Sequence, residues 1–358
     1  MPAYRTGVVV ALREERAGLQ KVDVDLDGTR ARAYVLTQLT GPVAAGDRVV
    51  LNTTAVDLDL GTGGWHFVHW NLERGAWVEP GPGHIMKMRY TSLQADVGST
   101  EEHLDPAIGA RTDAAGLPVV ATPLHSQVPA VAVGIRSVRP DARVAYVMTD
   151  GAALPLAMSD LVATLRDRGL IDTTITCGHA FGGDHETVNV YSALMVARHV
   201  VDADVAIVAM GPGIVGTGTA LGFTGMEVGA VLDATVGLDG VPVACLRASA
   251  ADPRSRHVGI SHHTVTALTV GTRSRVTVPI PAVAGTVEDD LRNELAISGI
   301  ADRHDVVAVG VPDVIGHFTA LDLRVTSMGR PAEDDPILFE CAAAAGVASV
   351  SSAGIAVT

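Results

Sequence analysis

The sequence has few cysteines and no dense cluster of positive charge, and each shortage excludes a class of protein. The three cysteines, Cys177, Cys245 and Cys341, are widely spaced and form no CxxC pair. Neither a disulfide framework nor a cysteine-based zinc site is therefore predicted. Lysine and arginine are scattered, and the formal net charge is −14. Because phosphate binding along a nucleic acid needs a basic patch, no nucleic-acid partner is expected.

Long apolar runs are missing as well. No uncharged apolar stretch approaches the roughly 18 residues that a membrane span needs. The first apolar run, Thr6–Leu12, is short and is followed at once by charged residues, which is not the pattern of a signal peptide. We therefore expect a cytoplasmic protein that does not cross a membrane.

Aromatic residues are scarce, at 4 per cent, although apolar residues as a whole reach 47 per cent. The core must therefore consist mainly of alanine, valine and other small side chains. Such cores suit parallel α/β sheets, whose strands are buried on both faces. The length of 358 residues predicts about two domains.

The start of the chain has the sequence pattern of a small β domain. Short runs such as TGVVVAL, QKVDVDL and RARAYVL are separated by Gly, Asp or Pro, and several alternate apolar with polar residues. This pattern is typical of strands and tight turns, so we predict a small antiparallel β barrel or sandwich over residues 1–78. Residues 79–117 are rich in Pro and Gly and then polar, which predicts a linker that wraps between domains. One short ordered stretch is expected near Met86–Tyr90.

From residue 118 onward, apolar runs alternate with segments of helical length. Strands that alternate with helices predict βαβ units, and therefore a doubly wound, mainly parallel sheet of about seven strands over residues 118–358. The segment HETVNVYSALMVARHVV is expected to be one of the helices. The expected strands are residues 119–124, 143–149, 173–178, 204–210, 242–248, 275–280 and 305–311.

Residues capable of chemistry follow the ends of these strands, whereas ordinary short turns lead into them. Ligands of open α/β sheets bind beyond the carboxyl ends of the strands, so we predict one composite site at this edge. Loops of the third and fourth strands should face one crevice, because strands joined by a short crossover often lie side by side. The predicted site contains His125, Asp150, His179, Asp184, His185, Gly211, Gly213, Gly216, Thr217, Arg254 and His263, with His262 beside them.

The segment GPGIVG, residues 211–216, matches G-x-G-x-x-G directly after an apolar strand. Its glycines would let the backbone approach an anion or phosphate closely. A nicotinamide site is disfavoured, because the loop follows the fourth strand rather than the first and Arg247, not an acidic residue, ends the next strand. The alternative is a structural turn whose glycines let a strand and a helix pack closely.

Histidines and carboxylates supply the candidate acids and bases, which are His179, Asp184, His185 and His263. The same residue types suit zinc, manganese or iron, but no H-E-x-x-H or H-x-x-x-H pair on one helix is present. We therefore predict no tightly bound transition metal. A structural alternative is helix capping, with Asp184 as the cap of the helix that follows it and Ser261 as the cap of the later segment HTVTALTV.

Two further groups have both a chemical and a structural interpretation. Arg254, together with Arg256, would clamp a carboxylate or phosphate, or it would belong to a solvated turn. Cys177 lies near His179 and Ser126 follows His125, but a buried cysteine is more often a small apolar residue than a nucleophile. G-x-S-x-G is absent, so an α/β-hydrolase elbow is not indicated.

Five segments together resemble one bacterial family, labelled domain of unknown function 3866. They are LNTTAVDLDLGTGGWHFVHWNL, PGHIMKMRYTSLQ, GHAFGGDHETVNVYSAL, MGPGIVGTGTALGFTG and SRHVGISHHTVTAL, and the resemblance spans nearly the whole chain. It implies a bacterial, cytoplasmic protein and supplies no catalytic residue.

The function predicted from these observations is an enzyme, a hydrolase or group-transfer enzyme, that acts on a small anionic metabolite at the carboxyl edge of the sheet. GPGIVGTGT would bind the anion, and His179, Asp184 or His263 would act as acid and base. One alternative is a non-catalytic sensing or assembly protein whose β domain recruits a partner. A metal-dependent hydrolase is the other. The sequence identifies no cofactor, and it does not decide whether the protein forms a homo-oligomer.

Overall fold

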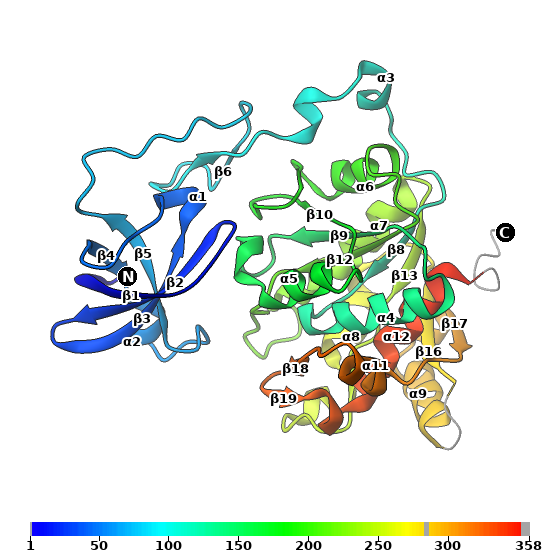
Figure 1. The fold of residues 1–358 in the computed structure, drawn as a ribbon. Coiled ribbons are helices and arrows are strands. Elements are labelled where there is room, and N and C mark those ends of the chain that lie inside the picture. Colours follow the sequence, from blue (N-terminus) through cyan, green and yellow to red (C-terminus); the bar gives the residue numbers. More distant parts are fainter. Residues whose placement is uncertain (1, 283–285, 352–358) are drawn as a thin grey trace. The chain divides into compact units, whose positions relative to one another are not determined.

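The structure is a computed structural model that describes residues 2–282 and 286–351. The chain divides into two compact units, Met1–Gly98 and Ser99–Thr358 (Figure 1). The segment expected to be a linker is shared between them, and its first part holds a small hairpin, β6 (Met86–Lys87) with β7 (Ala95–Asp96). None of the helices in the described ranges has the length and hydropathy that a membrane crossing requires.

The first unit is a closed barrel with the strand order β1-β2-β3-β5-β4, which confirms the barrel predicted from the alternating runs. One detail differs, because β3 and β5 pair in parallel whereas the other pairs are antiparallel. Alternate side chains such as Val22, Val24 and Val35 point inward and are fully buried. The elements are β1 (Tyr4–Arg16), β2 (Leu19–Leu26), β3 (Thr29–Leu36), α1 (Thr37–Thr40), β4 (Arg48–Asn52), α2 (Thr54–Asp57) and β5 (Trp65–Asn71).

The second unit contains an all-parallel sheet of eight strands in the order β11-β10-β9-β12-β8-β13-β16-β17. This confirms the predicted α/β fold. The strand beyond the expected seven is β11, which has two residues and pairs with the edge of β10. The strands are β8 (Pro118–Ala121), β9 (Val144–Thr149), β10 (Thr173–Thr176), β11 (His185–Glu186), β12 (Val205–Met210), β13 (Val241–Ala244), β16 (Thr277–Pro281) and β17 (Asp305–Val309).

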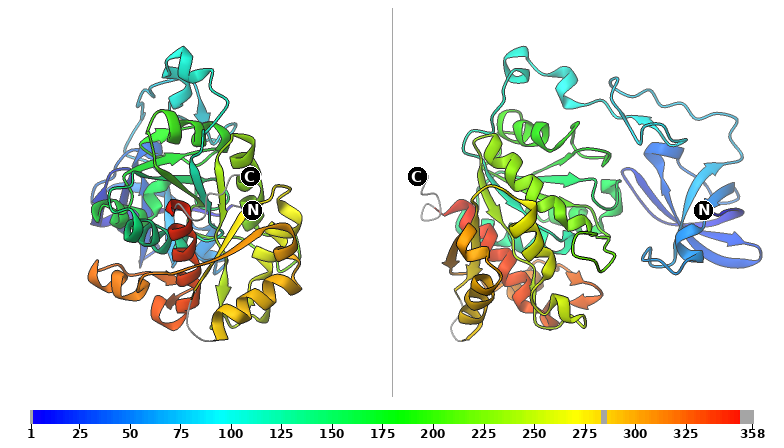
Figure 2. Two further views of the ribbon diagram at one scale, coloured as in Figure 1. Left: turned by 90° about the vertical axis from the view of Figure 1, so that its right-hand side faces the viewer. Right: turned by 180° about the vertical axis from the view of Figure 1, so that it is seen from behind.

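Helices cover both faces of this sheet, as a doubly wound fold requires. On one face, α6, α7 and α9 pack against side chains such as Ala145 and Val147. On the other, α4, α5, α11 and α12 pack against Tyr146 and Met148. The two faces can be compared in Figure 1 and in the rear view of Figure 2. The helices are α3 (Pro106–Gly109), α4 (Val128–Val138), α5 (Asp160–Asp167), α6 (Val190–His199), α7 (Glu227–Gly237), α8 (His262–Thr266), α9 (Thr286–Ile297), α10 (Ile300–Arg303), α11 (Val314–Ala320) and α12 (Pro336–Val350).

Helices α4 and α12 approach each other closely because each has a glycine at their contact. A Cβ atom at Gly134 would overlap the carbonyl oxygen of Ala343, and one at Gly346 would overlap that of Val131. The small residues around them, such as Ala342, are fully buried. The scarcity of aromatic residues is thus matched by tight packing between backbones.

The strand order corrects one expectation. Strands β10 and β12 are not neighbours, because β9 lies between them and pairs with both. The crossover from β10 to β12 therefore skips one strand. As a result, the loop after β9, which begins at Asp150, lies between the two loops that were expected to meet directly.

Of the two helix caps expected from the sequence, one was wrong and the other is confirmed. Helix α6 begins at Val190, and its cap is Asn189, whose side chain accepts from the Ser192 amide. The proposed cap Asp184 was therefore wrong, because the residues expected to form the first turn make the edge strand β11 instead. Ser261 does cap α8, where its hydroxyl accepts from the His263 amide.

Candidate functional site

An acidic residue outside the predicted set, Glu227, lies at the carboxyl end of β9. This residue begins α7, after the loop that leaves β12. Thr149, the last residue of β9, donates its hydroxyl to Glu227 Oε1 at 2.6 Å. A Cβ atom at Gly151 would lie 2.6 Å from Glu227 Oε2, so glycine there leaves the space that the carboxyl group occupies.

Burial shifts the pKa of the Glu227 carboxyl group. Loss of water around Glu227 raises its pKa from 4.5 to about 7; the Thr149 hydrogen bond lowers it, and the negative charge of Asp150 raises it further. Near neutral pH both protonation states are thus well populated. A group of this kind can accept and return a proton in one catalytic cycle.

Asp150 links this group to the loop after β10. Its Oδ2 accepts the backbone N–H of His179 at 2.9 Å. Gly178 has a φ of 66°, and a Cβ there would overlap the Asp150 carboxylate, so the close approach depends on glycine. The structure therefore brings the predicted site residues Asp150 and His179 into contact through the His179 backbone, and Asp150 is near enough to Glu227 for its charge to raise that pKa.

The glycine loop, which starts at Gly211 directly after β12, extends toward the segment that follows β13. Its first residue, Gly211, is buried against the carbonyl group of Ala153, and the Pro212 carbonyl accepts the N–H of Ala153. Gly213 has a φ of 99° and is exposed. The loop then forms a short hairpin in which Gly216 pairs with Phe223.

Thr217 stabilises the tip of this hairpin. Its amide and its hydroxyl both donate to the carbonyl group of Gly222, at 2.8 and 3.1 Å. On the near side of the hairpin, a Cβ at Gly216 would lie 3.8 Å from His263 Nε2. Gly216 and His263, both among the predicted site residues, therefore lie close together.

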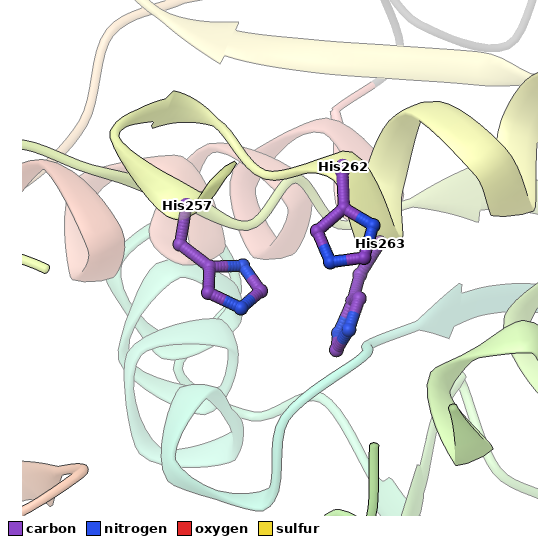
Figure 3. Close-up of side chains that lie close together, drawn as sticks. All are labelled: His257, His262 and His263. Carbon is purple, nitrogen blue, oxygen red and sulfur yellow. The ribbon is translucent and has the colours of Figure 1, made fainter. Parts of the chain in front are cut away.

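Three histidines form a compact cluster next to this hairpin (Figure 3). One nitrogen each of His257, His262 and His263 can be chosen so that all three lie within 4.8 Å of one another. The His263 ring stacks on Phe223 at 3.8 Å between centroids and 4° between planes. Burial is the main cause that lowers the pKa of His257 to about 4 and that of His263 to about 3, so both imidazoles are neutral at pH 7.

A buried ion-pair network supports the cluster. Arg247 is 3 % exposed, and its Nη1 donates to His263 Nδ1 at 3.2 Å. Asp252 accepts from Arg254 at 2.8 Å and lies 3.5 Å from Arg247 and 3.6 Å from Arg330. The Arg254 hydrogen bond holds the pKa of Asp252 well below its usual range. Arg254 is therefore bound to a carboxylate of the chain itself.

Three other predicted site residues have structural contacts. Both ring nitrogens of His125 are engaged, Nδ1 by the Met210 carbonyl at 3.2 Å and Nε2 by Ser159 at 2.7 Å. Asp184 accepts from the amide and hydroxyl of Thr174, near the start of β10, and from Arg166. His185 lies on the edge strand β11, and its Nδ1 is 3.4 Å from the Thr100 hydroxyl. We therefore leave these three out of the candidate site.

The sequence contained a weak signal for the residue that it missed. Glu227 is the only charged residue between Gly211 and Leu232. A single acid in so apolar a stretch must either point to solvent or be held by a partner. Nothing in the sequence identifies Thr149 as that partner, because the two residues are 78 positions apart.

The first unit holds a separate cavity of about 370 Å³. Its lining is mainly apolar and includes Leu36, Leu60, Phe67 and Leu93. It offers no paired acid and base among the described residues, so it is not the candidate active site.

Comparisons with known proteins support the family and add no activity. No curated relative matches the sequence. A family model with the description "Protein of unknown function (DUF3866)" matches residues 32–346. Since this range covers most of the chain and includes all the site residues described above, the protein belongs to the DUF3866 family.

Proposed function

We propose that the protein is an enzyme that hydrolyses, or transfers a group from, a small anionic metabolite, with Glu227 as its general base. The proposal is supported mainly by the carboxyl group of Glu227, which is half-buried at the carboxyl end of β9 and whose pKa is raised to about 7. Catalytic bases work best when their pKa lies near the working pH.

The chemistry assigned to each group follows from its contacts. The ionised Glu227 takes a proton from water or from a substrate hydroxyl, and its protonated form returns that proton to the leaving group. The Thr149 hydroxyl fixes the orientation of the carboxyl group. Asp150 holds the His179 loop in place, and the glycine hairpin after β12 lets backbone approach the substrate.

A panel of chromogenic anions tests the proposal with the full chain. We expect turnover of at least one of p-nitrophenyl phosphate, p-nitrophenyl sulfate and the p-nitrophenyl ester of succinate. Failure to turn over the whole panel, together with saturable binding of one of its anions, would favour the sensing alternative. If chelator-treated protein required added metal for turnover, the metal-dependent hydrolase would be favoured.

The Asp150→Asn variant should shift the pH profile of the active enzyme. The Asp150 charge disfavours ionisation of Glu227, so its removal lowers the Glu227 pKa. Activity that depends on the carboxylate then appears at lower pH, and the acidic limb of kcat/KM moves to lower pH. Asparagine retains an oxygen that can accept the His179 N–H. A limb that stays in place or moves to higher pH would contradict the assignment of Glu227 as base.

A further inference from the structure

The histidine cluster has the residue types of a metal site, but one of its hydrogen bonds is unsuited to a metal. A guanidinium group only donates hydrogen bonds. Because Arg247 Nη1 lies 3.2 Å from His263 Nδ1, that nitrogen is the acceptor, and the neutral ring carries its proton on Nε2. His263 Nε2 is then an N–H donor and not a lone-pair ligand. Metal-bound histidines instead donate their second nitrogen to a carboxylate, carbonyl or water.

The other two histidines also fit a hydrogen-bonding role better than a metal-binding one. His257 Nδ1 lies 2.6 Å from the Ser261 hydroxyl, which already accepts the His263 amide. The tautomer in which this hydroxyl donates to His257 Nδ1 carries the His257 proton on Nε2. His262 Nε2 is buried, and the described residues provide no hydrogen-bond partner for it. A buried polar atom without a partner is costly, so this nitrogen marks where a ligand atom would be stabilised.

Charge at the cluster also opposes a cation. Arg247, Arg254 and Arg256 are among the causes that lower the imidazole pKa values, whereas Asp252 acts in the opposite direction at His257. The guanidinium of Arg256 lies near the tip of the glycine hairpin, 3.7 Å from the position of a Cβ at Gly218. A positive field of this kind attracts an anion.

We infer that His257, His262 and His263 form a binding site for a tetrahedral oxyanion of the phosphate type. One ring nitrogen of each histidine lies within 4.8 Å of the other two, and the rings are inclined at 35°, 84° and 66° to one another, so the cluster holds nitrogens from three differently oriented rings close together. A tetrahedral anion offers oxygens in several directions, whereas a planar carboxylate is best matched by a single guanidinium fork. The inference rests on the proposed function in that it names the substrate anion for the same edge of the sheet.

Calorimetric titration of the full chain with inorganic phosphate tests this site without any need for turnover. We expect one phosphate per chain, with acetate binding more weakly. His262→Phe and His263→Phe keep an aromatic ring and remove the donors, so each should weaken phosphate binding roughly tenfold or more, the effect of a lost hydrogen bond to a charged group. His317→Phe, which changes an exposed histidine on α11, is the matched control and should bind like the wild type.

The melting temperature of each variant separates loss of the site from loss of the fold. If His263→Phe unfolds, His262→Phe decides, because His262 Nε2 has no partner to lose among the described residues. Absence of saturable phosphate binding to the wild type would overturn the inference, and so would stoichiometric zinc that is lost in both variants. Glu227→Gln should retain phosphate binding, so failure of the anion site and failure of the catalytic proposal give different results.

Discussion

The Glu227→Gln variant should lose at least about 100-fold in kcat on the substrate that the panel identifies, the lower end of the range for a general base. Glutamine is nearly isosteric and can still accept the Thr149 hydroxyl hydrogen bond, but it cannot take up a proton near pH 7. KM should change little, because the anion is assigned to the histidine cluster. The measurement is steady-state kinetics across pH on the full chain.

Glu340→Gln is the matched control for this prediction. Burial also raises the pKa of Glu340, which lies on α12, so the control removes a second perturbed carboxyl group of the same type. Its kcat should remain within about twofold of the wild type, as for a substitution away from the reacting atoms. Equal losses in both variants would mean that neither reports on catalysis.

The Gly346→Val variant should be destabilised by about 3 kcal/mol or more, the upper range for overpacking a core. Its Cβ would overlap the carbonyl oxygen of Val131, a backbone atom that cannot move unless α4 and α12 separate. Gly134→Val should behave similarly, because its Cβ would overlap the Ala343 carbonyl group. Urea unfolding monitored by circular dichroism measures both.

Gly237→Ala is the control, and we expect it to change stability in the opposite direction. Gly237 is the last residue of α7, is exposed, and has no heavy atom within 4 Å of its added Cβ. Alanine should therefore stabilise the protein by at most about 1 kcal/mol through helix propensity. Wild-type stability in Gly346→Val would contradict the close contact between the two helices.

The sequence predicted the fold well wherever periodicity decides structure. Alternation in runs such as QKVDVDL indicated the barrel, and the apolar strands from β8 to β17 were recognised because parallel strands are buried on both faces. Strand order was not predictable, because β12 inserts between β8 and β9 through long-range packing. The edge strand β11 is too short to leave a periodic signal and was interpreted as the start of a helix.

The site residues were harder to predict than the fold. The carboxyl-end rule grouped Asp150 with His179 and Gly216 with His263, and the members of each pair lie close together because parallel strands end at one edge. It could not separate His125 and Asp184, whose hydrogen bonds are with the chain itself, from the other residues of the proposed site. Glu227 was missed because its raised pKa results from burial and from Asp150, and both depend on the folded chain.

The most direct test is a titration of the Glu227 carboxyl group in the full chain. Carbon-13 NMR of glutamate-labelled protein can follow each side-chain carboxyl signal with pH, and the signal that is absent from Glu227→Gln identifies the residue. We expect a midpoint near 7, because burial raises the pKa of Glu227 to about that value. A midpoint near 4.5, the ordinary value for glutamate, would show that the carboxyl group is solvated and would remove the basis for a general base at this site.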